Sequence, residues 1–403
     1  MMIRLPCILF SLAFLINQFV LFNSAPAQTE ARFMLAWQGV QDYFTTALRE
    51  MEIVGGSMMF LHAGEVEGAV YYGMADKDVQ RPVDKHTIYH WASITKTFTG
   101  IAIMQLRDRQ LLSLDHAIID YIPELKAVHN PYGDMRNITI RQLMSHSAGF
   151  RDPTWPWGGD QDWHPYEPKE WQQLVAMMPY TEILFKPGSQ YRYSNLGIVF
   201  LGRIIELISG DDFEVYIDKN IFKPLEMYKS YFDHTPYHLL AFRSNNYYII
   251  NGEMITNGLD FDTGVTVSNG GLNAPLGDMM KYLNFLIGNG DSYNGILNRS
   301  SLEEMWHIQH EVSSDSKLKE SIALNFFIIE RGDLQVIGHT GEQKGFMSFF
   351  YIHPKSRIGC LVVFNTVVNT FNTEGDLVEL NTINLRRNLR LKILDENFPI
   401  YTN

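Results

Sequence analysis

The chain has 403 residues, of which 46% are hydrophobic and 13% aromatic, and its formal net charge is −12 at pH 7. This composition excludes a disordered chain and a collagen-like repeat, and two cysteines are too few for a small scaffold held by disulfides. The acidic balance argues against binding to nucleic acid, which normally needs a basic surface. A chain of this length can bury one large core or two smaller ones.

Residues 1–27 have the pattern of a secretory signal peptide. Arg4 is the only charge before an uncharged apolar run at 5–22, and the small residues at 24–27 offer a cleavage site after Ala27. We therefore expect a secreted or periplasmic protein. The alternative is a retained membrane anchor, because about 17–25 apolar residues can span a bilayer. Cleavage would leave Cys360 as the single cysteine, and its place in an apolar run indicates a buried residue.

Hydrophobic periodicity predicts the elements of the first third of the chain. Two apolar runs at 57–61 and 68–72, joined by Ala63-Gly64-Glu65, indicate a hairpin. Residues 93–112 are apolar nearly all round, as in a buried central helix. A helix is expected before the hairpin, with these residues on one face: Trp37, Val40, Phe44, Ala47 and Leu48.

The rest of the chain separates into two regions. About 126–259 reads as a mostly α-helical part, with helical patterns near 140–147, 168–178 and 195–209. Strand patterns return at 323–330, 334–339, 345–352 and 358–365, and a final helix has Val378, Leu385, Leu389 and Ile393 at helical spacing. We expect an α/β protein of the α+β type. Its antiparallel sheet, flanked by helices, takes strands from both chain ends (about 28–125 and 260–403), and the active site lies between the sheet and the helical part.

The first motif with chemical meaning is Ser93-Ile94-Thr95-Lys96, where an extended segment turns into the buried helix. Positions i and i+3 share a helix face, so the Lys96 ammonium would lie one turn from the Ser93 hydroxyl. A serine hydroxyl is a weak nucleophile until a base takes its proton, which a lysine kept unprotonated by its surroundings can do. Taken alone, the pattern is more often an N-cap serine followed by a surface lysine.

Three further motifs follow along the chain. Tyr193-Ser194-Asn195 offers a phenol that can share a proton with Lys96 and an amide that can orient Lys96 or a substrate carbonyl. In His339-Thr340-Gly341, followed by Glu342, the glycine allows close backbone approach, and the next N–H can form an oxyanion hole with that of Ser93. Gly270-Gly271-Leu272 suits a tight backbone beside a cleft. Each of these motifs, taken singly, also has an ordinary structural interpretation.

In this order and with these spacings, the motifs resemble those of the serine β-lactamase and penicillin-binding-protein superfamily. The resemblance is strongest to its class C β-lactamase-like branch, which includes esterases and D-amino-acid peptidases. It runs from about residue 54 to residue 365 and includes the segments LMSHSAGF at 143–150 and KPLEM at 223–227.

The resemblance implies a role for each matching residue. Ser93 would be the acylated nucleophile, Lys96 its proton partner and Tyr193 the general base or acid. Asn195 would orient the substrate, and the strand with His339, Thr340 and Gly341 would border it. The amides of Ser93 and Glu342 would stabilise the oxyanion, and water would then resolve the acyl-enzyme.

Two positions depart from the pattern of β-lactamases in this branch. β-Lactamases of this branch carry K-T-G where this chain has His339-Thr340-Gly341. The charge of their lysine helps to bind the carboxylate of β-lactams. A histidine with a pKa near 6.5 is mostly neutral at pH 7. We therefore expect a hydrolase of esters, amides or D-amino-acid peptides, with an efficient β-lactamase or a slow-turnover penicillin or peptidoglycan sensor as alternatives. Glu342 stands where small residues are common, and its carboxylate either repels anionic substrates or points to solvent.

No cofactor and no metal are expected, because the 13 histidines show no metal-ligand spacing. His86, His90 and His146 are interpreted as structural residues. The expected partner is a small-molecule or peptide substrate, not nucleic acid, and a membrane only if the N-terminal segment is retained; the oligomeric state stays open. An aromatic cluster either walls an apolar pocket or packs locally: Trp155, Trp157, Trp163, Tyr166 and Trp171.

Overall fold

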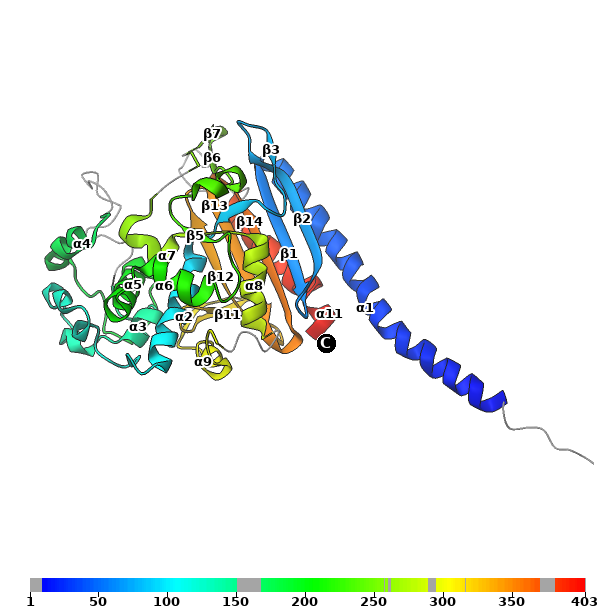
Figure 1. The fold of residues 1–403 in the computed structure, drawn as a ribbon, viewed down its shortest axis with the longest axis horizontal. Helices are drawn as coiled ribbons and strands as arrows, with labels where there is room; N and C mark the ends of the chain where they lie inside the picture. The colour runs from blue at the N-terminus through cyan, green and yellow to red at the C-terminus, as the bar shows by residue number, and fades with distance from the viewer. Residues whose placement is uncertain are drawn as a thin grey trace, which may run out of the picture.

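The fold is that of a computed structural model (Figure 1). It describes residues 9–150, 168–256, 258–259, 262–288, 295–315, 317–369 and 381–402, and for residues 9–27 the backbone alone.

A nine-stranded antiparallel sheet forms the centre of the molecule, in the order β3-β2-β1-β14-β13-β12-β11-β10-β9. Strand β1 pairs with β14, so the two ends of the chain join in one sheet, and the expected fold class is confirmed. The strands of this sheet are β1 (Gly55–His62), β2 (Glu65–Asp76), β3 (Arg81–Pro82), β9 (His310–Ser314), β10 (Lys319–Ile322), β11 (Phe327–Arg331), β12 (Leu334–Gln343), β13 (Phe346–His353) and β14 (Ile358–Phe364).

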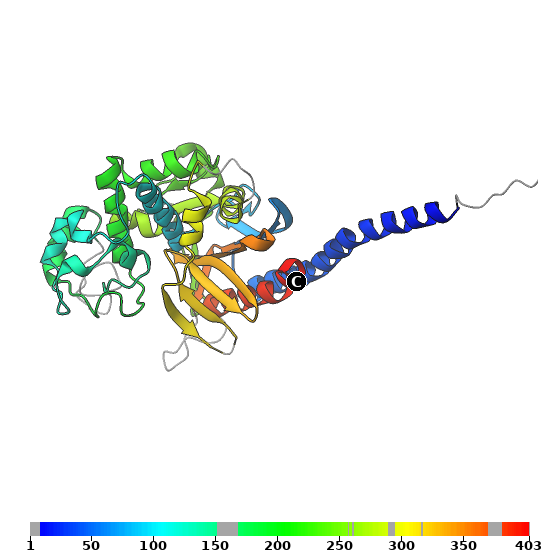
Figure 2. The ribbon, with the colours of Figure 1, turned by 90° about the horizontal axis from the view of Figure 1, so that it is seen from below.

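Helices cover both faces of this sheet, and the side chains of β14 show why. Alternate residues of a strand point to opposite faces. Cys360 and Val362 therefore join the core beneath α1 (Leu9–Glu50) and α10 (Thr382–Glu396), while Leu361 and Val363 join the larger core around α2 (Thr95–Asp108) and α8 (Leu276–Ile287). Figure 2 shows the blue α1 and the red α10 on one side of the sheet and the helical block on the other. Cys360 is buried, as expected, and forms no disulfide within the described residues.

Helix α1 carries the apolar face that its sequence predicts. Trp37, Val40, Phe44 and Leu48 are buried against the sheet and α10. The helix continues without a break through the expected cleavage site at Ala27, and its first half extends away from the body of the molecule (Figure 1). Among the helices of the described residues, none combines the length and the apolarity needed to cross a bilayer.

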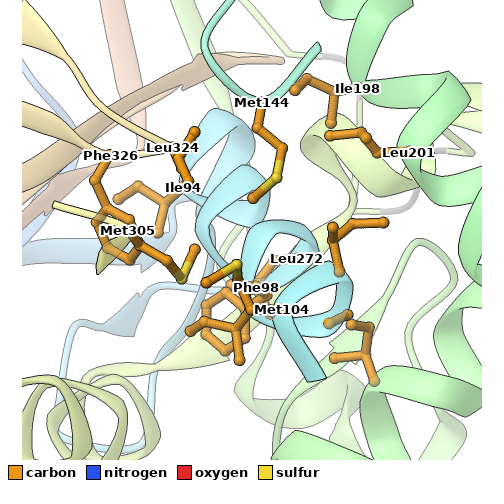
Figure 3. Close-up of a cluster of buried hydrophobic side chains, with 14 of the residues drawn as sticks. Ile94, Phe98, Met104, Met144, Ile198, Leu201, Leu272, Met305, Leu324 and Phe326 are labelled. Atoms are coloured by element: carbon orange, nitrogen blue, oxygen red, sulfur yellow. The ribbon is translucent and has the colours of Figure 1, made fainter. Parts of the chain in front are cut away.

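Helix α2 is the buried central helix that the sequence predicts. Every residue from Thr95 to Leu106 is buried. Figure 3 shows side chains from distant parts of the chain packed around it, among them Met144, Ile198 and Phe326. The other helices of the described residues are α3 (Ile140–Met144), α4 (Trp171–Met177), α5 (Asn195–Ser209), α6 (Phe213–Ile217), α7 (Val267–Gly270), α9 (Arg299–Glu304) and α11 (Pro399–Thr402).

Two small sheets connect the helical part to the rest. One has the order β4-β8-β5 and the other β15-β6-β7, in which β15 and β6 are parallel. Strands β5, β6 and β7 lie within residues 126–259, the region that the sequence predicts to be mostly helical. The bounds are β4 (Ile88–His90), β5 (Tyr231–Phe232), β6 (Tyr247–Ile250), β7 (Glu253–Ile255), β8 (Leu272–Pro275) and β15 (Thr366–Asn369).

The strand expected at 323–330 is correct only in its second half, where β11 begins at Phe327. The amide of Ala323 donates to the carbonyl of Phe326, and Asn325 has a φ of 61°, so the run contains a turn between β10 and β11. The amide of Asn325 donates to the carbonyl of Met144, a contact from the helical part that fixes this turn.

Candidate active site

Ser93 lies in a tight turn at Ala92–Ile94 that leads directly into α2. The indole of Trp91 donates a hydrogen bond to the carbonyl of Ala274. The hydroxyl of Thr95 donates to the carbonyl of Ala92 and accepts a hydrogen bond from the amide of Leu272. Ala92 has a φ of 49°, where a residue with a side chain stores about 1–3 kcal/mol of strain. The surrounding hydrogen bonds stabilise this strained conformation. Ser93 itself is partly exposed, while the residues on either side of it are buried.

The hydroxyl of Ser93 is within hydrogen-bond distance of two possible proton partners. Lys96 Nζ lies 3.0 Å from Ser93 Oγ, and the Tyr193 hydroxyl lies 2.9 Å from the same atom. Lys96 is completely buried, with its ammonium nitrogen 5.0 Å from the centre of the Tyr193 ring. Lys96 Nζ also donates to the carbonyl of Asn269, at 2.8 Å. Lys96 and Tyr193, which the order of the motifs associated with Ser93, therefore both contact its Oγ atom.

Strand β12 runs directly beside the Ser93 turn. A Cβ atom at Gly341 would lie 2.2 Å from the carbonyl oxygen of Trp91, so only glycine allows this approach. Strand β11 pairs with β12 as far as Gly338, and the segment that follows carries the H-T-G motif. The close approach brings the Gly341–Glu342 peptide next to the turn that holds the hydroxyl.

His339 is neutral and buried, with 2% of its surface exposed. Burial, and then the charge of Lys96, lower its pKa to about 3. Its Nδ1 atom lies 2.6 Å from the carbonyl oxygen of Thr340, a contact that requires the proton on Nδ1. The Nε2 atom therefore keeps a lone pair, and the site has no permanent cation at this position.

Glu342 faces the opposite side of the sheet from His339. Ile337 belongs to the core around α2 and Val336 to the core under α10, so the alternation along β12 turns Thr340 and Glu342 toward α10. The Glu342 carboxylate is 42% exposed and lies 3.5 Å from the guanidinium of Arg386. Of the two interpretations of this carboxylate, the one in which it points to solvent fits this exposure.

Asn195 is the first residue of α5, after the N-cap residue Ser194, whose hydroxyl accepts from the amide of Gly197. The carbonyl of Asn195 accepts a hydrogen bond from the Asn269 side chain, at 3.4 Å. Asn269 belongs to α7, just before the Gly270-Gly271 pair. This segment therefore contacts both Lys96 and the start of α5.

Comparison with known proteins decides the family. Residues 40–381 match the family described as Beta-lactamase. The chain belongs to the β-lactamase family. It is 25% identical to "Protein flp" of Staphylococcus aureus over 323 residues, which are 79% of this chain and 61% of that protein. The chain thus spans about three fifths of the length of this curated relative.

Two further relatives of this β-lactamase-family chain bear on its chemistry and fold. It is 27% identical to "Esterase EstB" of Burkholderia gladioli over 194 residues, 46% of this chain and 48% of that protein. A solved class C β-lactamase has the same fold, with a TM-score of 0.70 at 18% identity over 90% of this chain and 96% of that one. The matched region therefore belongs to the serine β-lactamase and penicillin-binding-protein superfamily.

Sequence reasoning missed the contact of His146 with this β-lactamase-family site. The imidazole stacks on the Tyr193 ring, with ring centres 4.4 Å apart, and Nδ1 accepts the amide proton of Ser194 at 3.1 Å. Burial, with Lys96 and His339 adding to it, holds the pKa of His146 well below its usual value. The only pointer in the sequence was its place in the segment 143–150.

The expected aromatic cluster falls mostly outside the described residues, where Trp155, Trp157, Trp163 and Tyr166 lie. Trp171 packs edge-on against Phe200, with the Arg203 guanidinium 5.3 Å from its ring centre, at a cavity of about 300 Å³. Within the described residues, no three His, Cys, Asp or Glu side chains are grouped to hold a metal ion.

Proposed function

We propose that the protein is a secreted serine hydrolase that works through an acyl-enzyme on Ser93. Lys96 and Tyr193 are its proton-transfer partners, and the substrate is an ester, an amide or a D-amino-acid peptide. The observation that carries the proposal is the position of Ser93 Oγ, 3.0 Å from Lys96 Nζ and 2.9 Å from the Tyr193 hydroxyl. A nucleophile within hydrogen-bond reach of a base is what covalent hydrolysis requires.

The mechanism follows from these contacts. Ser93 Oγ attacks the substrate carbonyl carbon while its proton passes to the Lys96–Tyr193 pair, and the amides of Ser93 and Glu342 bind the oxyanion that forms. The bond to the leaving group then breaks, and the leaving group takes up the proton. Water attacks the acyl-enzyme along the same path in reverse, which releases the acid and restores Ser93.

The proposed substrate class rests on His339. A neutral imidazole supplies no permanent charge to hold a substrate carboxylate, so esters, amides and peptides with a neutral group at this position should bind better than β-lactams. The relative named an esterase supports the same choice. A second candidate, β-lactamase activity or slow release of a β-lactam, is favoured by the shared fold with the class C enzyme.

The proposed export rests on the N-terminal sequence. Arg4 precedes the apolar run, and the small residues that follow suit cleavage after Ala27. N-terminal sequencing of the protein recovered outside the cytoplasm should find Gln28 first. An intact N-terminus in a membrane fraction would instead indicate the retained anchor.

The test of the proposed function is the Ser93→Ala variant. Hydrolysis of p-nitrophenyl esters should fall by about 10³-fold or more, because the nucleophile of the whole reaction is removed. A fluorophosphonate probe should add one mass increment to wild type at Ser93 and none to the variant. Ser300→Ala, at an exposed serine of α9, serves as control and should keep both labelling and turnover. Full hydrolysis by Ser93→Ala would refute the proposal, and faster turnover of nitrocefin than of esters would favour the second candidate.

A further inference from the structure

Arg386 of α10 reaches strand β12 from the face of the sheet that is covered by α1 and α10 (Figure 2). Its Nη1 atom donates a hydrogen bond to the carbonyl oxygen of Gly341, at 3.3 Å, and lies 3.5 Å from Glu342 Oε2. The side chain is 19% exposed, so most of it lies between helix and sheet. A helix near the C-terminus is thereby connected to the peptide that the proposed mechanism uses for the oxyanion.

The burial of this cation has a cost. Burial lowers the pKa of Arg386, Glu342 counteracts this effect, and the neighbouring Arg390 adds to it. A guanidinium stays charged in a protein in spite of such shifts. Apolar residues in place of a buried ion pair are often neutral or stabilising, so stability alone is a weak reason for a cation here. The position of the charge relative to the Gly341 carbonyl suggests a role in the reaction.

The peptide group between Gly341 and Glu342 carries two atoms that matter. In a planar trans peptide the C=O and N–H bonds point in opposite directions, so the Glu342 N–H points away from the oxygen that Arg386 contacts. A charge-assisted hydrogen bond to the carbonyl oxygen polarises the whole group and strengthens its N–H as a donor. Donors that are fixed before the oxyanion forms contribute strongly to catalysis.

We infer that Arg386 is a positioning residue of the oxyanion hole, because it holds and polarises the peptide that supplies the Glu342 N–H. The inference rests on the proposed function, in which that N–H and the Ser93 N–H bind the oxyanion. The Glu342 carboxylate opposes the effect, since its negative charge offsets part of the field of Arg386 at the same peptide. The two members of this ion pair therefore act on kcat in opposite directions.

The test compares Arg386→Met, Arg386→Lys and Glu342→Gln with wild type in the hydrolysis of p-nitrophenyl acetate, with kcat, KM and Tm recorded. Arg386→Met removes the charge and keeps an apolar stem, and it should lower kcat about tenfold with a change in KM below about twofold. Arg386→Lys restores a cation and should recover part of this loss. Glu342→Gln should raise kcat about twofold.

Arg331→Met is the matched control. Arg331 of β11 forms an ion pair with Asp395 of α10, the helix that carries Arg386, and this pair lies away from Gly341. It should leave kcat unchanged, whatever its effect on Tm. An unchanged kcat in Arg386→Met, or equal losses of kcat in Arg386→Met and Glu342→Gln, would overturn the inference. Ser93→Ala, measured in parallel, separates the two proposals: hydrolysis that survives there refutes the proposed function, and its loss leaves the Arg386 result to stand alone.

Discussion

The charge of one side chain, His339, bears on which substrates the site accepts. The imidazole lies near Lys96, packs edge-on against Phe327 with ring centres 5.0 Å apart, and is held neutral by burial. A carboxylate entering beside it would be desolvated without a counter-charge from the imidazole, which costs binding energy. A neutral substrate group avoids this cost.

A lysine at this position should change the preference. His339→Lys adds a cation to the strand that carries the H-T-G motif, and it should raise kcat/KM for nitrocefin, which carries a carboxylate, about tenfold relative to p-nitrophenyl acetate. The ratio of the two kcat/KM values is the measurement. His339→Gln, which remains neutral, is the control and should not raise the ratio. An equal rise in both variants would show that side-chain size and not charge sets the preference.

Part of the candidate site was accessible from the sequence because its spacing is local. Ser93 and Lys96 are one helical turn apart, so their contact follows from helix geometry. Tyr193 joined them only through the order of motifs, since it is 100 residues away from Ser93. The stacking of His146 on Tyr193 and the hydrogen bond from Arg386 to Gly341 had no local pattern, because such contacts depend on how distant elements pack.

At the scale of elements, helix α1 divides into two halves with different roles. Its second half is part of the core: Trp37 lies against β2 so closely that a Cβ at Gly68 would come within 2.4 Å of the indole. Phe33 stacks on the same indole, with ring centres 5.9 Å apart. The half before Ala27 extends away from the sheet in Figure 1. The stability of the sheet should therefore depend on the second half alone.

Two changes to α1 test this division. A chain that starts at Gln28 should keep the Tm of the full chain, because it retains Phe33, Trp37 and the other core residues of α1. Trp37→Ala should lower the free energy of unfolding by about 3–5 kcal/mol, since it leaves a cavity between helix and sheet. Met34→Ala is the matched control at an exposed residue of the same helix and should have little effect. Thermal and urea unfolding measure all three; a chain from Gln28 that melted as low as Trp37→Ala would contradict the division.

The elements that were predicted well have a clear hydrophobic period. The first half of the strand expected at 323–330 is wrong, because its structure depends on a contact with a distant part of the chain. The hairpin and the strands β12 to β14 alternate or are continuously apolar, as strands covered on both faces are. The run at 323–330 is equally apolar, but Leu324 and Phe326 pack around α2 instead of continuing a strand (Figure 3). Apolar character alone did not distinguish the two cases.

At the scale of the whole molecule, two cores on either side of one sheet bury several ionisable groups without an internal disulfide among the described residues. His90 is the last residue of β4, with its two ring nitrogens 3.1 Å from side-chain oxygens of Asn273 and Gln343. Burial, with Arg243 adding to it, lowers its pKa to about 3. Burial lowers the pKa values of His146 and His339 in the same way. In contrast, burial raises the pKa of Asp233 to about 7.

These shifts determine how stability depends on pH. The folded-state pKa of each of the three histidines is below the unfolded value of about 6.5, so the unfolded chain binds more protons as the pH falls. Their contribution is complete above about pH 6.5 and is lost as the pH falls below that value, toward about 3 for His90 and His339. Asp233 has the opposite sign, because its folded-state pKa exceeds the unfolded value of about 3.9, and its contribution is lost as the pH rises through about 7.

Between about pH 4 and 6 the three histidines outweigh Asp233, so the free energy of unfolding should decrease as the pH falls. His90→Gln keeps an amide in contact range of Asn273 and Gln343 but removes one titrating group. It should reduce the slope of this free energy against pH by about 1.4 kcal/mol per pH unit, the value for one proton taken up on unfolding. Urea unfolding at several pH values measures the slope, and His86→Gln, at an exposed histidine nearby, should leave it unchanged. The same slope in His90→Gln and wild type would mean that His90 is already protonated in the folded chain, a state that its burial and the charge of Arg243 disfavour.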